Sequence, residues 1–110
     1  MSTLILADNP INNNEVINLL EELDLPNLIN LNLYKTGITD LKIFKLVIKY
    51  KKLIILKIGE NKFDYKNDKE SFYQLPELLE EFGITGCFEG DNANFIRKLG
   101  IENLKIFLFQ

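Results

Sequence analysis

The sequence predicts an α/β fold built from about four similar repeats of 25–27 residues and a closing strand, in a single domain over residues 1–110. Short tetrads recur at a spacing of 25 or 26 residues, and they begin at Leu25, Tyr50, Leu75 and Ile101. After each tetrad the hydrophobic residues alternate as in a strand. After each of the first four strands they recur every three or four positions, as in a helix. The tetrads divide the chain into a first (1–27), second (28–52), third (53–78) and fourth (79–103) repeat and a closing strand (104–110).

Each predicted strand contains two hydrophobic residues that are two positions apart, so that both side chains point to the same face. The pairs are Leu4 and Leu6, Leu31 and Leu33, Leu56 and Ile58, Phe82 and Ile84, and Phe107 and Phe109. The fourth pair comes one residue later than the spacing of 25 requires, so the register of the fourth repeat is the least regular. The alternate positions point to the opposite face, and they include Ile5, Asn30, Asn32, Tyr34, Ile55, Lys57 and Gly83.

The segments between the strands have helical periodicity. It predicts helices over residues 13–23, 40–50, 68–75 and 92–99. The predicted N-caps of the first, second and fourth helices lie within Asn12 to Asn14, at Thr39 or Asp40, and at Asp91 or Asn92. Pro76 is predicted to end the third helix, because proline cannot continue one.

A small polar or sulfur-containing residue stands three positions after each of the first four strand pairs. These residues are Asn9, Thr36, Asn61 and Cys87. Hydrophobic residues follow two positions later at Ile11, Ile38 and Phe63, whereas Glu89 breaks the pattern in the fourth repeat.

These positions together resemble the leucine-rich repeat, LxxLxLxxNxL, most clearly over residues 28–38 and 53–63. The repeat length and the predicted helices are similar to the ribonuclease-inhibitor-like subclass. The resemblance implies a short solenoid with parallel strands on a concave face and helices on a convex face. It also implies that Asn9, Thr36, Asn61 and Cys87 form a structural ladder that hydrogen-bonds the backbone at the bends.

The resemblance further implies that the concave face is the surface for partners. There Tyr34, Ile55 and Lys57 give a mixed aromatic, apolar and basic patch, and tyrosine is a frequent anchor of protein interfaces. We therefore predict that Asn32, Tyr34, Ile55 and Lys57 bind a protein partner.

The composition excludes several kinds of catalytic and metal site. The chain has no histidine and one cysteine, Cys87, so histidine-based catalysis, an intrachain disulfide and a thiolate metal cluster are all excluded. No GxxxxGK[ST] motif is present. We expect no enzyme, no metal and no cofactor, and we expect a non-enzymatic adaptor.

The charge is divided along the chain, although the net charge is only −3. Residues 1–34 carry −5, residues 35–69 carry +6, and residues 70–110 carry −4. The predicted second helix and the turn after it carry Lys42, Lys45, Lys49 and Lys52. Lysine outnumbers arginine twelve to one, which is typical of A/T-rich codon usage. These lysines are therefore explained either as an ordinary solvated helix face or as a surface that binds RNA phosphates.

Two alternatives to the adaptor hypothesis therefore stay open. The first is a component or accessory factor of a ribonucleoprotein such as the ribosome, docked on rRNA through these four lysines without reading DNA sequence. The second is a regulator of an enzyme.

The N-terminus lacks the basic and apolar segments of a signal peptide, and no apolar run approaches the length that spans a bilayer. We expect a cytoplasmic protein without membrane contact, with the nucleus as the alternative location.

Overall fold

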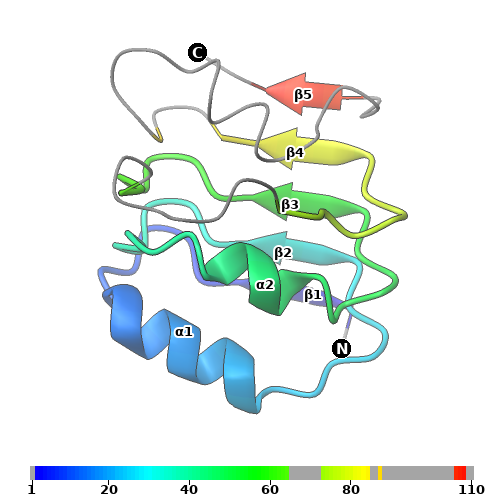
Figure 1. Ribbon diagram of the computed structural model, residues 1–110, viewed down its shortest axis with the longest axis horizontal. Coiled ribbons are helices and arrows are strands. Elements are labelled where there is room, and N and C mark those ends of the chain that lie inside the picture. The colour runs from blue at the N-terminus through cyan, green and yellow to red at the C-terminus, as the bar shows by residue number, and fades with distance from the viewer. Residues whose placement is uncertain (1, 65–72, 85–86, 88–105, 109–110) are drawn as a thin grey trace.

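The computed structural model describes residues 2–64, 73–84 and 87 and the backbone of residues 106–108. In these residues five short strands form one parallel sheet in chain order (Figure 1). They are β1 (Thr3–Ile5), β2 (Asn30–Asn32), β3 (Ile55–Lys57), β4 (Glu81–Gly83) and β5 (Ile106–Leu108). The predicted α/β class and the parallel strands are confirmed.

The register of the sheet aligns equivalent residues of successive repeats. Leu4, Leu31, Leu56, Phe82 and Phe107 pair in one row from β1 to β5. Leu31, Leu56 and Phe82 have no exposed surface. Because side chains alternate along a strand, the side chains of Leu4, Leu31, Leu56 and Phe82 in this row face the core and those of the residues that flank them face the opposite side.

Helix α1 (Asn13–Glu22) forms where the sequence predicts a helix over 13–23. The Asn12 side-chain oxygen accepts a hydrogen bond from the Glu15 backbone N–H at 3.0 Å, which is the N-cap arrangement. Val16, Ile17 and Leu20 are buried, and Val16 and Leu20 belong to the same hydrophobic core as Leu31 of the sheet. The helix ends at Leu23, which has an extended backbone and leads into the first tetrad.

Helix α2 (Ile43–Val47) is much shorter than the predicted helix over 40–50, and its N-cap is Lys42, without a side-chain cap, rather than Thr39 or Asp40. The Asp40 side chain instead accepts from the Lys42 N–H at 2.9 Å, in the turn before the helix. Both flanks are tight turns with i to i+3 hydrogen bonds, such as Phe44 to Leu41 and Tyr50 to Val47. These tight turns take the place of α-helix over the rest of the predicted segment.

The third predicted helix, over 68–75, is wrong in its last part, because residues 73–75 are not helical. Pro76 disfavours helical geometry in the residue before it, which accounts for the non-helical backbone at Leu75. Residues 68–72 and the predicted helix over 92–99 lie outside the described residues.

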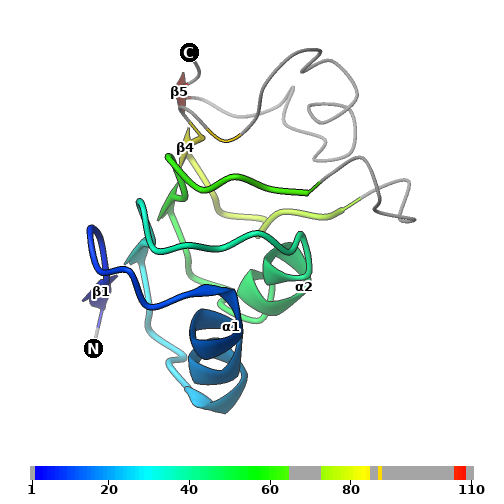
Figure 2. The ribbon, with the colours of Figure 1, turned by 90° about the vertical axis from the view of Figure 1, so that its left-hand side faces the viewer.

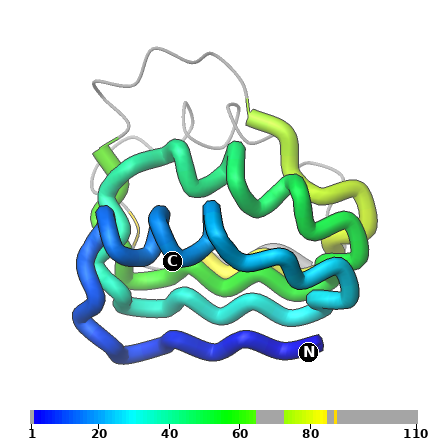
Figure 3. The backbone as a smooth tube through the Cα atoms, turned by 90° about the horizontal axis from the view of Figure 1, so that it is seen from below, coloured from blue at the N-terminus to red at the C-terminus, as the bar shows by residue number. Residues whose placement is uncertain are grey.

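Both helices cover the same face of the sheet (Figure 2). Figure 3 shows that the chain turns back at the end of β1 and of β2 and returns through α1 and α2, respectively, to the start of the next strand. The core between the two layers includes fully buried Leu28, Leu33, Leu53 and Ile58. The other face of the sheet has no described helix over it, and this leaves it available for a site.

Candidate functional site

The outer face is the name we use for the side of the sheet opposite the helices. It consists of Thr3, Ile5, Asn30, Asn32, Ile55, Lys57, Glu81 and Gly83, together with Tyr34 just after β2. Two rows run across the strands: Thr3, Asn30, Ile55 and Glu81 pair in the first, and Ile5, Asn32, Lys57 and Gly83 pair in the second. The structure thus places the four predicted partner-binding residues on one surface, with Asn32 opposite Lys57.

Large hydrophobic side chains on the outer face are open to solvent. Ile5 is 60% exposed and Tyr34 is 36% exposed. Ile55 lies on β3, between these residues and β4, and is half-buried. An exposed tyrosine beside aliphatic residues is a usual composition for the centre of a protein interface.

Sequence reasoning did not assign Glu81 to this face. The shift of one residue in the fourth repeat hid it, although alternation around Phe82 was the signal that could have placed Glu81 beside Gly83. Glu81 is half-buried and pairs in register with Ile55. It gives the β4 side of the outer face a negative charge opposite in sign to that of Lys57.

The side-chain oxygens of the two asparagines of β2 are not available to a ligand: that of Asn32 is already hydrogen-bonded, and that of Asn30 is buried. The Asn32 Oδ1 accepts a hydrogen bond from the Tyr34 N–H at 3.1 Å, so its amide nitrogen remains as a donor. The Asn30 Oδ1 is buried and has no hydrogen-bond partner within the described part of the chain. The remaining polar atom of the Asn30 side chain is likewise its amide nitrogen.

Lys57 extends toward β4, where glycine leaves room for it. A Cβ atom placed on Gly83 would lie 3.6 Å from Lys57 Cγ, so the lysine stem lies close to the bare backbone of Gly83. Lys57 is half-buried, and it forms no ion pair with any residue that the structure describes. Its ammonium group is therefore available to a ligand.

Asn61 has the most extensive side-chain hydrogen bonding among the predicted ladder residues. Its Oδ1 accepts from the N–H groups of Thr36, Gly37 and Ile38 in the second repeat, at 3.0, 3.0 and 3.1 Å. Its Nδ2 donates to the carbonyls of Leu33, Ile58 and Gly59, at 2.8, 2.9 and 3.2 Å. With 1% exposure, this side chain connects two successive bends in the interior.

The other three residues at this position make fewer contacts. Thr36 Oγ1 donates to the Leu33 carbonyl at 2.9 Å, and Cys87 Sγ lies 3.2 Å from the Ile58 carbonyl, to which it donates. Asn9 donates to the carbonyls of Leu6 and Ala7 in its own bend, at 3.1 and 3.2 Å, and is exposed. All of these contacts are internal to the fold.

Burial raises the pKa of Cys87 to about 12; the Asn61 N–H opposes this rise and the Glu60 charge adds to it. Because the folded pKa of Cys87 lies above that of an unfolded thiol, about 8.5, the neutral thiol's contribution to stability is complete below pH 8.5 and is lost as the pH rises toward 12.

We expect a thiol-reactive dye at pH 8 to label Cys87 of the native chain at least about a hundredfold more slowly than that of the urea-unfolded chain. Equal labelling rates, measured by absorbance, would contradict the burial of this thiol.

The structure does not gather the four predicted RNA-phosphate lysines into one free cluster. Lys42 forms an ion pair with Glu21 of α1 at 3.1 Å, and Lys52 donates to the Asn27 side chain at 3.0 Å. Lys49 donates to the Leu20 carbonyl at the end of α1. Lys45 is exposed on α2.

The contact of Lys49 has a clear electrostatic basis. The last turn of α1 contains no basic residue of its own, and a cation near a helix C-terminus stabilises the exposed carbonyls. Lys49 from the second repeat supplies that cation. Three of the four lysines thus connect the second repeat to the first, whereas the sequence indicated only a solvated face or an RNA surface.

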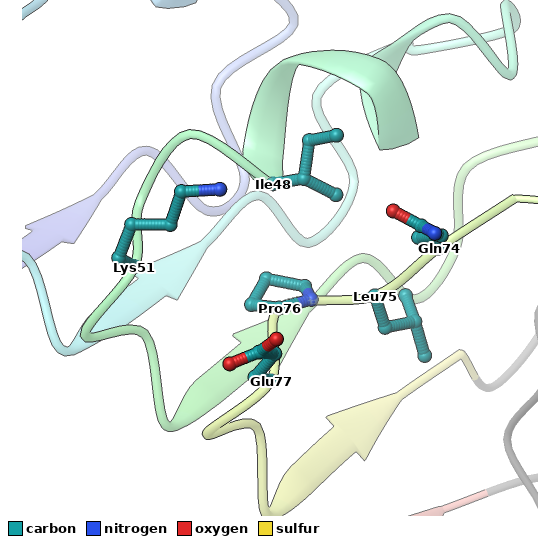
Figure 4. A pocket seen from close by; sticks show the side chains of 6 residues that line it. All are labelled: Ile48, Lys51, Gln74, Leu75, Pro76 and Glu77. Atoms are coloured by element: carbon teal, nitrogen blue, oxygen red, sulfur yellow. The ribbon is translucent and has the colours of Figure 1, made fainter.

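Among the described residues, two hollows lie beside the tetrads, between adjacent repeats. Ile48, Lys51, Gln74, Leu75, Pro76 and Glu77 line the larger one, of about 230 Å³ (Figure 4). Leu23, Asp24, Leu25, Pro26, Lys49, Tyr50 and Lys51 line the other, of about 180 Å³. Their linings come from equivalent positions 25 residues apart, so the hollows are a consequence of the stacking of the tetrads.

Comparison with known proteins finds no matching family model, no matching curated protein and no matching solved structure. Among the described residues no helix has the length and apolar character required to cross a membrane.

Proposed function

We propose that the chain is a short leucine-rich-repeat solenoid that acts as a non-enzymatic adaptor and binds another protein through the outer face of its sheet. The repeated tetrads, the parallel strands in chain order and the side chain of Asn61 that bridges two bends all support the solenoid. In such a fold the outer face corresponds to the concave surface.

One observation carries the binding function. The two described helices cover one face of the sheet, while the other face exposes Ile5 and Tyr34 on or beside hydrogen-bonded strands. Removal of this hydrophobic surface from water by a partner lowers the free energy of the complex. Asn32 and Lys57, in the same row as Ile5, add hydrogen-bonding groups that fix the orientation of a bound partner.

The ribonucleoprotein alternative has less support, because Lys42, Lys49 and Lys52 have partners within the chain. A phosphate would have to compete with those contacts. Nor does any observation on the structure favour an enzyme regulator over a general adaptor.

The variant Ile5→Ser/Tyr34→Ala tests the adaptor proposal. We expect it to weaken binding of a partner purified from native extract by about 30-fold or more, because an aromatic anchor commonly contributes 2 kcal/mol or more. The folding of the variant should be unchanged by circular dichroism, since both side chains are exposed. Affinities measured by surface plasmon resonance would show the difference.

The variant Lys42→Glu/Lys45→Glu/Lys52→Glu is the matched control, and it leaves the helix contact of Lys49 intact. It should bind the protein partner as the wild type does. If instead this variant loses co-sedimentation with RNA particles while the outer-face variant retains it, the ribonucleoprotein alternative replaces the adaptor proposal.

A further inference from the structure

We infer that the outer face recognises a largely apolar segment of its partner protein that carries one acidic side chain, and that this aspartate or glutamate carboxylate binds to Asn32 and Lys57. This inference rests on the proposed function and specifies the chemistry of the partner.

The polar groups at the centre of the outer face are hydrogen-bond donors. Asn32 uses its oxygen for the Tyr34 N–H, which leaves its amide nitrogen, and Lys57 offers an ammonium group without an ion pair in the described part of the chain. These two residues are opposite each other in register, on strands about 4.8 Å apart. The Asn30 oxygen is covered, so this side chain also has its amide nitrogen left. A group of donors with one cation complements a carboxylate, which offers only acceptors.

The surroundings favour a protein carboxylate over a nucleic acid. Nucleic acids bind through several cations that neutralise successive phosphates, whereas Lys57 is the one cation in the described strands, with Glu81 one strand further along. Ile5, Tyr34 and Ile55 flank the donors with apolar surface. A single acidic side chain within an otherwise apolar segment fits this arrangement.

The register also gives a spacing for the partner's residues. Ile5 and Lys57 lie in the same row, two strands apart, which is about 9.6 Å. An extended peptide that crosses the strands advances about 3.3 Å per residue. Residues two or four apart in such a peptide point to the same side, and they span about 6.6 and about 13.2 Å, below and above this distance. A hydrophobic residue over Ile5 is therefore expected two or four residues from the carboxylate on Lys57.

A random 12-residue peptide library displayed on phage, panned on the wild-type chain, tests the inference. Bound phage are screened against the Ile5→Ser/Tyr34→Ala variant to select peptides that need the outer face. We expect these peptides to be enriched in Asp or Glu two or four residues from a hydrophobic residue. Lys57→Met, which keeps the length of the stem, should weaken their binding by about tenfold, as should replacement of the acid by its amide in the peptide.

Lys51→Met is the matched control, because Lys51 lines a hollow beside the tetrads and does not belong to the outer face. It should leave peptide binding unchanged. Outer-face-dependent peptides that lack an acidic residue, or that bind Lys57→Met as tightly as wild type, would overturn the inference and leave the adaptor proposal standing. A library that returns no outer-face-dependent peptide would overturn both.

Discussion

Replacement of Asn61 by alanine is expected to lower the free energy of unfolding by about 3 kcal/mol or more. The change removes the acceptor of three consecutive N–H groups, those of residues 36–38. It also removes the donor to three carbonyls of two repeats. Each buried polar group left without a partner costs about 1–3 kcal/mol, and at 1% exposure of this side chain water cannot readily substitute. Urea unfolding followed by circular dichroism measures the loss.

Asn9→Ala is the matched control, since it changes the same residue type at the same repeat position. The Asn9 side chain is exposed and bonds only to carbonyls of its own bend among the described residues. We expect a loss of about 0.5 kcal/mol or less, because water can hydrate the groups that it leaves. Equal effects of the two substitutions would show that the bridge between repeats does not stabilise the fold.

Phe44→Ala is expected to cost about 3–5 kcal/mol, the usual range for truncation of a buried phenylalanine. Phe44 is 1% exposed. The centre of its ring lies 5.7, 5.9 and 6.3 Å from the ring centres of Phe63, Tyr73 and Phe82, respectively. These partners belong to the third and fourth repeats, so the cavity would affect the contact between α2 and the part of the sheet around β4. The midpoint of thermal unfolding measures the effect.

Leu78→Ala provides the comparison for this truncation, because Leu78 is 55% exposed although it occupies the last position of a tetrad. Its cost should stay within about 0.5 kcal/mol. If Leu78→Ala destabilises the chain as much as Phe44→Ala, the aromatic cluster is not the centre of the core.

The candidate site was predictable from the sequence in part. Alternation around Leu31 and Leu56 placed Asn32, Ile55 and Lys57 on one face, because strand periodicity is a local property that needs no knowledge of neighbours. Glu81 was not assigned to this face, although alternation around Phe82 was enough to place it there; its position opposite Ile55 depends on how β4 pairs with β3. The hydrogen bond that commits the Asn32 oxygen to Tyr34 depends on the backbone path after β2, which the sequence pattern does not specify.

The sequence by itself determined the strand positions, the capped helix α1 and the α/β class, because hydrophobic period and capping act within a few residues. Only the tertiary structure decided the length of α2, since the tight turns that flank its single helical turn depend on packing between repeats as much as on propensity. It also decided the partners of the lysines. Lys49 reaches the end of α1 from a position 29 residues from Leu20, and only folding brings a side chain and a carbonyl so far apart in sequence into contact.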